Sequence, residues 1–383
     1  MSERLTRDKP VALNAALGQR PRRGKRWIGL GGIVAGLAAY AAIPGQPGSD
    51  AASKLLGGGV EKAHAALAPF HADCSADPAP LQREITRIAH EFNGKVGIAV
   101  TKAGCSWLVG ERAEQFFPQQ SVSKLWVSLA VLDAVDQGRL SIDQPVTIRP
   151  ADLTVFNQPL RGEVLEQGFV TKPIAGLMKN ALSLSDNTAN DRLLWTVGGP
   201  DVVRATLKEK QLGGIRFGPG ERLLQSAIAG LKWSPEYSIG RNFEQARARL
   251  PMELREAALA HYMVDPMDGA TPQGIAHALA QLAAGQLLSP SSTRVFMDIL
   301  SRTHSGPMRL KAGVARGWKV YHKTGTGQEL HGLATGYNDV AILEAPDGSF
   351  YAVAVMIGET HEPIPVRMKM MQSVSAAIGR IFG

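Results

Sequence analysis

The chain has 383 residues, of which 44% are hydrophobic and 20% are charged, a balance typical of a globular protein with a buried core. Its formal net charge is +8, but residues 1–26 hold eight Lys and Arg against two acids and so carry +6 of that charge. Because the remaining residues are nearly balanced, no basic stripe is left to bind phosphates. The composition therefore argues against a nucleic-acid-binding protein.

The N-terminal residues 1–44 have the pattern of an export signal. The basic run is followed at 27–43 by seventeen residues without a charge, and this order is what the export machinery recognises. Two outcomes stay open, namely cleavage at a small-residue site such as Ala39-Tyr40-Ala41, or retention at 27–43 as an inner-membrane anchor. Either outcome places the rest of the chain in the periplasm.

Residues 45–80 are rich in Ala, Gly, Ser and Pro, and predict a linker with one short helix at 51–67. Cys74, at the end of this linker, and Cys105 are the two cysteines of the chain. An even number of cysteines can pair in an oxidising compartment, so a disulfide and two unpaired thiols both stay open.

The folded unit is expected to begin near residue 81. Apolar positions at helical spacing predict a helix at 81–92, and the sequence at 94–101 predicts a strand with a hairpin partner at 105–109. A helix at 122–138 follows. The centre of the chain is mainly helical, with its clearest helices at 173–182, 188–197, 202–209, 252–263 and 271–284. The end returns to strands at 318–323, 340–343 and 351–357, with an Asp347-Gly348 turn and a last helix at 366–382.

Strands at both ends of the chain with helices between them indicate an α+β fold. One antiparallel sheet would be formed by both termini and flanked by helices, with an inserted all-helical lobe at about 139–285. We expect one domain at 81–383.

The segment Ser121-Val122-Ser123-Lys124 begins the helix expected at 122–138. Residues three apart share a helix face, so the Lys124 amine would lie beside the Ser121 hydroxyl and take its proton, which makes the hydroxyl a nucleophile. The Ser121 backbone N–H would have no intrahelical partner and could stabilise an oxyanion. Ser-x-x-Lys alone arises by chance in a chain this long, so the prediction depends on further motifs.

Ser185-Asp186-Asn187 lies in the break between two expected helices. A hydroxyl there can pass a proton to a leaving nitrogen, and an amide can hold a substrate carbonyl. Taken alone, the tripeptide would be interpreted as a helix N-cap, because Ser, Asp and Asn are the preferred capping residues.

Lys323-Thr324-Gly325 ends the strand expected at 318–323. A cation and a hydroxyl at a strand edge suit a substrate carboxylate, and a glycine lets a flat substrate approach the backbone. The N–H of Thr326 would be a second donor to the oxyanion.

Ser-x-x-Lys, Ser-Asp-Asn and Lys-Thr-Gly in this order are the signature of penicillin-recognising serine enzymes, and the chain resembles class A β-lactamases. The resemblance covers about 85–383 and is clearest at 117–124, 185–190, 271–289 and 338–341. It implies acyl transfer from a β-lactam to Ser121, with Lys124 as base, alone or together with a glutamate acting through a water. The implied catalytic residues are Ser121, Lys124, Ser185 and Glu221, and the implied substrate-binding residues are Asn187, Lys323, Thr324, Gly325 and Thr326.

The glutamate that activates the deacylating water in class A enzymes falls in the least typical part of this chain. Ser185 and Lys323 are 138 residues apart, a few tens more than is usual in the family, and the surplus forms an extended loop at about 215–270. Glu221 keeps a Glu-x-x-Leu-amide pattern 36 residues after Ser185, at about the family's separation. In 232–236 a serine stands where the family has the glutamate, and Glu236 follows it. We favour Glu221, with Glu236 as the alternative.

Two alternative functions use the same acylation chemistry. One is a D-alanyl-D-alanine carboxypeptidase or another penicillin-binding enzyme acting on peptidoglycan peptides, and the other is a penicillin-binding module without turnover. Neither a metal site nor a cofactor is expected, because the nine histidines are scattered without His-x-His-x-Asp or His-Glu-x-x-His spacing. The expected partner is a small β-lactam or D-Ala-D-Ala peptide, bound by a monomer.

Overall fold

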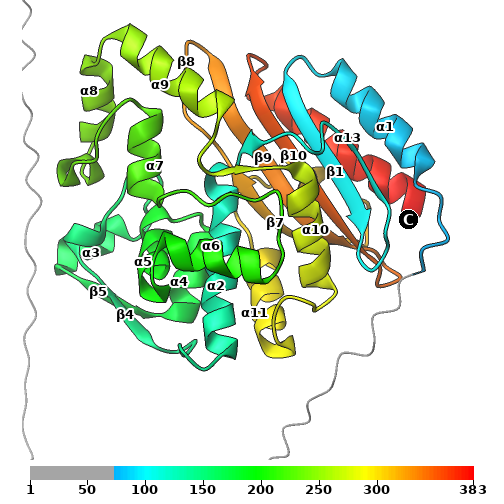
Figure 1. The fold of residues 1–383 in the computed structure, drawn as a ribbon, viewed down its shortest axis with the longest axis horizontal. Coiled ribbons are helices and arrows are strands. Elements are labelled where there is room, and N and C mark those ends of the chain that lie inside the picture. Colours follow the sequence, from blue (N-terminus) through cyan, green and yellow to red (C-terminus); the bar gives the residue numbers. More distant parts are fainter. Residues whose placement is uncertain (1–72) are drawn as a thin grey trace, which may run out of the picture. The chain divides into compact units, whose positions relative to one another are not determined.

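The computed structural model describes residues 73–383, which Figure 1 shows as a ribbon. The expectations for the leader at 1–44 and for the linker before residue 73, including its short helix, lie outside the described residues. Within 73–383, no helix is both long and apolar enough to cross a membrane.

The main sheet is antiparallel and uses strands from both ends of the chain, as the sequence predicted. Its order is β2-β1-β10-β9-β7, and β8 also pairs with β9. The N-terminal strand β1 lies between β2 and the C-terminal strand β10 (Figure 1). The six strands are β1 Lys95–Lys102, β2 Leu108–Glu111, β7 Lys319–Gly325, β8 Glu329–Leu330, β9 Leu333–Glu344 and β10 Phe350–Thr360.

Alternate side chains of β10 enter two hydrophobic cores on opposite faces of this sheet. Ala354 and Met356 point into one core, whereas Val353 and Val355 point into the other, because neighbouring side chains of a strand face opposite sides. Helix α10 covers the first face, and α1 and α13 cover the second (Figure 1). These helices are α1 Ala79–Glu91, α10 Pro272–Ala283 and α13 Ile364–Phe382.

The helical lobe is built around α2, Lys124–Asp136, in which 11 of 13 residues are buried. The other helices outside 221–264 are α3 Arg161–Gln167, α4 Ile174–Ser183, α5 Asn187–Val197, α6 Pro200–Glu209, α11 Pro290–Ser301 and α12 Leu310–Gly313. The lobe also holds a two-stranded sheet of β4, Pro145–Ile148, and β5, Val170–Pro173, which the sequence did not predict. Helix α10, placed in the lobe by the sequence, packs on the main sheet instead.

Residues 221–264 form three helices, of which the sequence predicted only the last, at 252–263; the other two lie where it indicated an extended loop. We call this part the α7–α9 segment; it contains α7 Glu221–Ile228, a 3₁₀ turn at Pro235–Ser238, α8 Asn242–Arg249 and α9 Met252–Val264. Leu224 of α7 and Leu259 of α9 pack with Leu330 of β8. The segment is therefore fixed to the edge of the sheet. After it, β6 Gly269–Ala270 pairs with β3 Phe117–Pro118.

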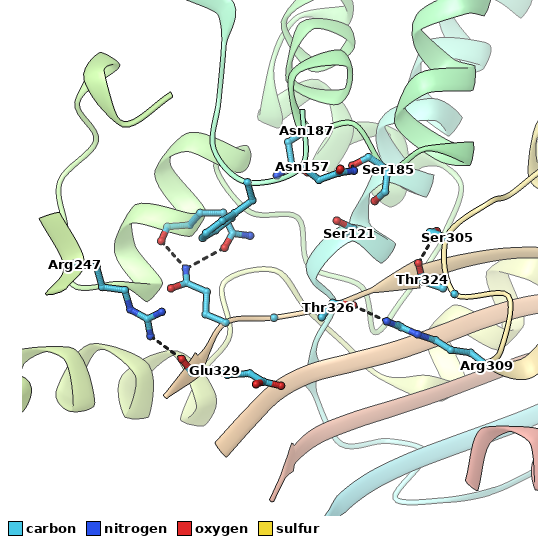
Figure 2. A pocket seen from close by; sticks show the side chains of 15 residues that line it. Ser121, Asn157, Ser185, Asn187, Arg247, Ser305, Arg309, Thr324, Thr326 and Glu329 are labelled. Carbon is cyan, nitrogen blue, oxygen red and sulfur yellow. Dashed lines mark hydrogen bonds between the residues drawn. The ribbon is translucent and has the colours of Figure 1, made fainter. Parts of the chain in front are cut away.

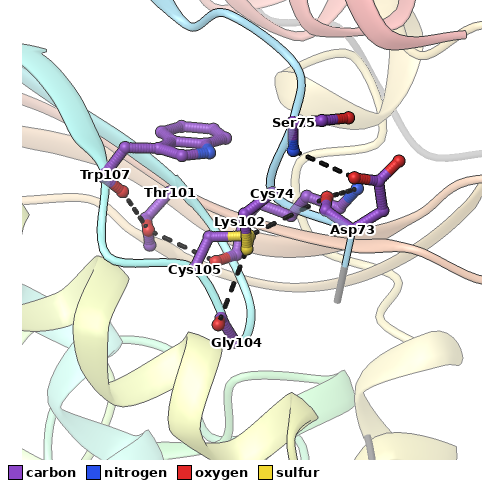
Figure 3. The surroundings of a disulfide bond; sticks show 8 residues. All are labelled: Asp73, Cys74, Ser75, Thr101, Lys102, Gly104, Cys105 and Trp107. Atoms are coloured by element: carbon purple, nitrogen blue, oxygen red, sulfur yellow. Dashed lines mark hydrogen bonds between the residues drawn. A yellow bond between two sulfur atoms is a disulfide. The ribbon is translucent and has the colours of Figure 1, made fainter. Parts of the chain in front are cut away.

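Cys74 and Cys105 form a disulfide (Figure 3), which decides between the two states left open by the sequence. Beside it, the Lys102 ammonium donates to the carbonyl of Asp73 at 2.8 Å. Together these contacts attach the first described residues to the turn between β1 and β2.

Candidate active site

Ser121 lies in a 3₁₀ turn, Gln120–Ser123, directly before α2, and not in the first α-helical turn that the sequence indicated. The preceding Gln120 has a positive φ of 54°, a strained conformation for a residue with a side chain. Its N–H donates to the Asp268 carboxyl at 2.8 Å, and its side-chain amide donates to the Tyr262 hydroxyl at 2.7 Å. These buried partners hold the turn that carries Ser121.

Lys124 connects the serine to a carboxylate. Its Nζ donates to Ser121 Oγ at 2.9 Å and forms an ion pair with Glu221 Oε1. The Lys124 side chain is fully buried and that of Glu221 is 5% exposed. A proton can therefore pass from Ser121, which faces the cavity, to two buried groups from which water is largely excluded.

Glu221 reaches Lys124 because it is the first residue of α7, whose start is held by Asp191. The Glu221 N–H donates to Asp191 Oδ1 at 2.9 Å. Burial and the charge of Glu221 raise the pKa of Asp191 to about 7. Glu236, the other glutamate considered from the sequence, is exposed in the 3₁₀ turn at Pro235–Ser238 and does not join this cluster.

Ser185 and Asn187 flank the residue that caps α5. The Asp186 carboxylate accepts the N–H groups of Ala189 and Leu160, each at 2.9 Å, so the N-cap interpretation holds for this residue. Ser185 has a φ of 57°, and its side chain points toward Ser121 in Figure 2. Asp186 therefore has a structural role, whereas its neighbours Ser185 and Asn187 line the cavity.

Lys323 connects the Ser-Asp-Asn motif to the Lys-Thr-Gly motif, to which it belongs. Its buried Nζ donates to Ser185 Oγ at 2.9 Å and to the carbonyl of Thr324 at 2.8 Å. Burial, together with the positive charges of Lys124 and Arg309, lowers the pKa of Lys323 well below its ordinary value. Because Ser185 Oγ accepts from Lys323, its own hydroxyl proton can be donated elsewhere.

Gly325 is explained by the close approach of β7 to the nucleophile turn. A Cβ atom at this position would lie 2.4 Å from the carbonyl oxygen of Gln119. The Asn338 amide, on β9, donates to the carbonyls of Pro118 and Gln119 at 2.7 and 3.1 Å. The sheet is thus locked directly onto the turn that carries Ser121.

Arg309 and Ser305 are site residues that sequence reasoning missed. Arg309 donates to the Gly325 carbonyl at 2.9 Å and to the Thr326 hydroxyl at 2.6 Å, while Ser305 is hydrogen-bonded to Thr324 at 2.7 Å. Both lie between α11 and α12 in a stretch without a recognisable motif, so no sequence signal could have identified them. They reach the site because the sheet places β7 beside that stretch.

These groups surround a cavity of about 410 Å³. Figure 2 shows Ser121, Ser185, Asn187, Thr324 and Thr326 around it. Among residues 73–383, no cluster of three or more His, Cys, Asp and Glu side chains could hold a metal ion. The accessible Ser121 hydroxyl thus has the proton-transfer partners Lys124 and Glu221 on one side. On the other side lie cationic and hydroxyl groups that can bind an anion.

Comparisons with known proteins identify relatives over most of the chain. A model described as the β-lactamase enzyme family matches residues 80–382. The chain is similar to β-lactamase VEB-1 of Pseudomonas aeruginosa, with 26% identity over 77% of this chain and 88% of that protein. It is also similar to a β-lactamase of Amycolatopsis lactamdurans, with 28% identity over 82% of this chain and 87% of that protein.

Solved structures show the same fold. A β-lactamase from Chitinophaga pinensis aligns with a TM-score of 0.64 and 23% identity over 78% of this chain and 98% of that chain. An ancestral class A β-lactamase aligns with a TM-score of 0.61 and 27% identity over 79% of this chain and all of that chain (100%).

Proposed function

Since this chain belongs to the β-lactamase enzyme family, we propose that it is a class A serine β-lactamase that opens the β-lactam ring through an acyl-enzyme on Ser121. The observation that carries the proposal is the position of Lys124 Nζ, which contacts both Ser121 Oγ and Glu221. One amine is thereby available to take the proton of the nucleophile and to exchange it with a buried carboxylate.

Acylation begins when Ser121 Oγ attacks the ring carbonyl. Lys124 takes the serine proton as it passes one of its own to Glu221, and the N–H groups of Ser121 and Thr326 stabilise the oxyanion. When the ring C–N bond breaks, Ser185 protonates the nitrogen and recovers a proton from Lys124. Lys124 then takes back the proton held by Glu221, which leaves a carboxylate beside the ester.

Deacylation uses that carboxylate. Glu221 takes a proton from a water molecule, whose oxygen attacks the ester carbonyl of the acyl group. The C–O bond to Ser121 breaks, and Oγ regains its proton from Lys124, which is reprotonated by Glu221. The sum of both stages is the addition of one water across the ring amide.

Substrate binding is assigned to the groups on either side of Ser121. Lys323 and Thr324, assisted by Arg309, take the ring carboxylate, since a cation and a hydroxyl are the donors such a group needs. Asn187 holds the amide of the acyl side chain. Gly325 supports this role indirectly, because it lets β7 lie close to the nucleophile turn.

Turnover of a chromogenic cephalosporin by the purified chain tests the function. We expect rapid multiple turnover, and a loss of roughly 10⁴-fold or more in Ser121→Ala, because that variant has no nucleophile. A single stoichiometric burst with a persistent adduct on Ser121, seen by mass spectrometry, would instead indicate a penicillin-binding enzyme or module.

We also propose that the chain acts in the periplasm as a monomer, either cleaved after export or anchored through 27–43. The Cys74–Cys105 disulfide supports an oxidising compartment. Fractionation of the native producing cell tests the compartment, and activity confined to the cytoplasm would contradict a periplasmic location. The mass of the mature chain tests whether the leader is cleaved, and the elution volume in size-exclusion chromatography tests whether the chain is a monomer.

A further inference from the structure

One wall of the cavity is formed by the α7–α9 segment and presents Arg247 of α8. A single hydrogen bond from its guanidinium is resolved, from Nη2 to the backbone carbonyl of Glu329 at 3.2 Å. Its Nε is buried and has no hydrogen-bond partner in the part of the chain that the structure describes. The side chain is thus held in place while much of its donor capacity is unused.

The charge of Arg247 is not neutralised by the protein. The Glu329 carboxylate, which belongs to the residue that Arg247 contacts, pairs instead with Arg367 at 2.9 Å. No ion pair joins Arg247 to an acid within 73–383, and the neighbouring charged group is Arg255 of α9. Burial and the charge of Arg255 lower the pKa of Arg247, so the site as built disfavours the cation that it contains.

The position of Arg247 indicates which part of a substrate it meets. In Figure 2, Arg247 and Arg309 lie on opposite sides of Ser121. The proposed function places the ring carboxylate beside Arg309 and the acyl amide beside Asn187, so a substituent beyond the amide extends toward Arg247. A guanidinium offers a planar pair of donors that matches a carboxylate.

We propose that Arg247 is a specificity residue that selects β-lactams whose acyl side chain carries a carboxylate. The inference rests on the proposed function, because it takes acylation of Ser121 by a β-lactam as its starting point. The carboxylate supplies the counter-ion that the described part of the protein does not provide.

The experiment compares three penicillins that differ only in the substituent on the acyl side chain. These are benzylpenicillin, its α-carboxyl derivative carbenicillin and its α-amino derivative ampicillin. The second-order rate constant for acylation of Ser121 is measured with each by quenched-flow mass spectrometry on the full chain. Arg247→Gln removes the charge, and Arg247→Lys keeps it without the planar fork. Arg249→Gln, an exposed position on the same helix, is the matched control.

We expect the unsubstituted enzyme to prefer the α-carboxyl over the α-amino compound, and Arg247→Gln to reduce that preference by about tenfold, the effect of one charged hydrogen bond. Arg247→Lys should retain an intermediate preference, and Arg249→Gln should retain all of it. An unchanged preference in Arg247→Gln, or an equal loss in Arg249→Gln, would overturn the proposal. The acylation ratio tests Arg247 whether or not the adduct is hydrolysed, whereas absence of turnover with all three compounds counts against the proposed β-lactamase alone.

Discussion

Buried basic side chains are paired to different degrees on the floor of the cavity, which we define as Ser121, Lys124, Ser185 and Lys323, and in the α7–α9 segment. On the floor, Lys124 and Lys323 each have two partners within the site. In the segment, the buried Nε atoms of Arg222, Arg247 and Arg255 have no partner among the described residues. The lysines of the floor are therefore fully engaged, whereas the arginines of the segment keep buried donors that the described part of the chain leaves unpaired.

The largest expected effect comes from Glu221, the first residue of the α7–α9 segment, whose carboxylate pairs with Lys124 on the floor. Glu221→Gln removes the carboxylate that receives protons from Lys124 and from water, so turnover of a chromogenic cephalosporin should fall on the order of 10³-fold. The acyl adduct on Ser121 should then persist in mass spectra of the intact protein. Glu236→Gln is the control, and equal losses in both variants would show that the assignment of Glu221 is wrong.

A smaller effect is expected when the segment is loosened. Phe243 of α8 is buried, and its ring lies edge-on to Phe156, at 5.0 Å, and to Tyr237. Phe243→Ala removes this packing, at a local cost of about 3 kcal/mol, while leaving Ser121 and Lys124 in place. We expect KM to rise about tenfold and kcat to change little. A loss confined to kcat would contradict this and mean that the packing of α8 serves the chemical steps and not substrate binding.

The last prediction concerns stability at the boundary between the two regions, where Asp191 holds the start of α7. The pKa of Asp191 is about 7 in the folded state, against an ordinary value of 3.8 that applies to the unfolded chain. Between these two pH values the folded protein retains a proton that the unfolded chain has lost. This group therefore stabilises the fold fully below the unfolded pKa, and its contribution is lost as pH rises toward 7, at up to about 1.4 kcal/mol per pH unit. Asp191→Asn should unfold at higher denaturant concentration than the parent near about pH 8, with the gap closing toward about pH 4. Parallel stability profiles would contradict this.

Elements with a strong local pattern could be predicted from the sequence, whereas those that depend on distant contacts could not. Most strands of the sheet and most long helices carry period-2 or helical patterns, and these were predicted with end shifts of a few residues. Two exceptions are β9, which was expected only at 340–343 but spans Leu333–Glu344, and α11, which was not expected. The 3₁₀ turn at Ser121 was interpreted as α-helix, because its geometry depends on Asp268 and Tyr262, far along the chain. Helices α7 and α8 have eight residues each, too few for a clear period.

Among the site residues, those in motifs could be named, and those placed only by tertiary contacts could not. Glu221 was proposed as a site residue from its separation from Ser185, and in the structure its carboxylate contacts Lys124. Arg309 and Asp191 act through contacts that depend on strand pairing and helix packing, which no local pattern encodes. Arg247 could not be predicted for the same reason.

The attachment of the nucleophile turn to distant parts of the chain has a consequence for timing. Gln120 depends on Asp268, 148 residues later, and the carbonyls of Pro118 and Gln119 depend on Asn338, at separations of 220 and 219 residues. A chain that emerges N-terminus first thus exposes Ser121 long before the groups that make it reactive, and pairing between such distant residues forms late. We expect the serine to stay unreactive until these contacts have formed, so a fluorescent penicillin should label only molecules that have completed folding.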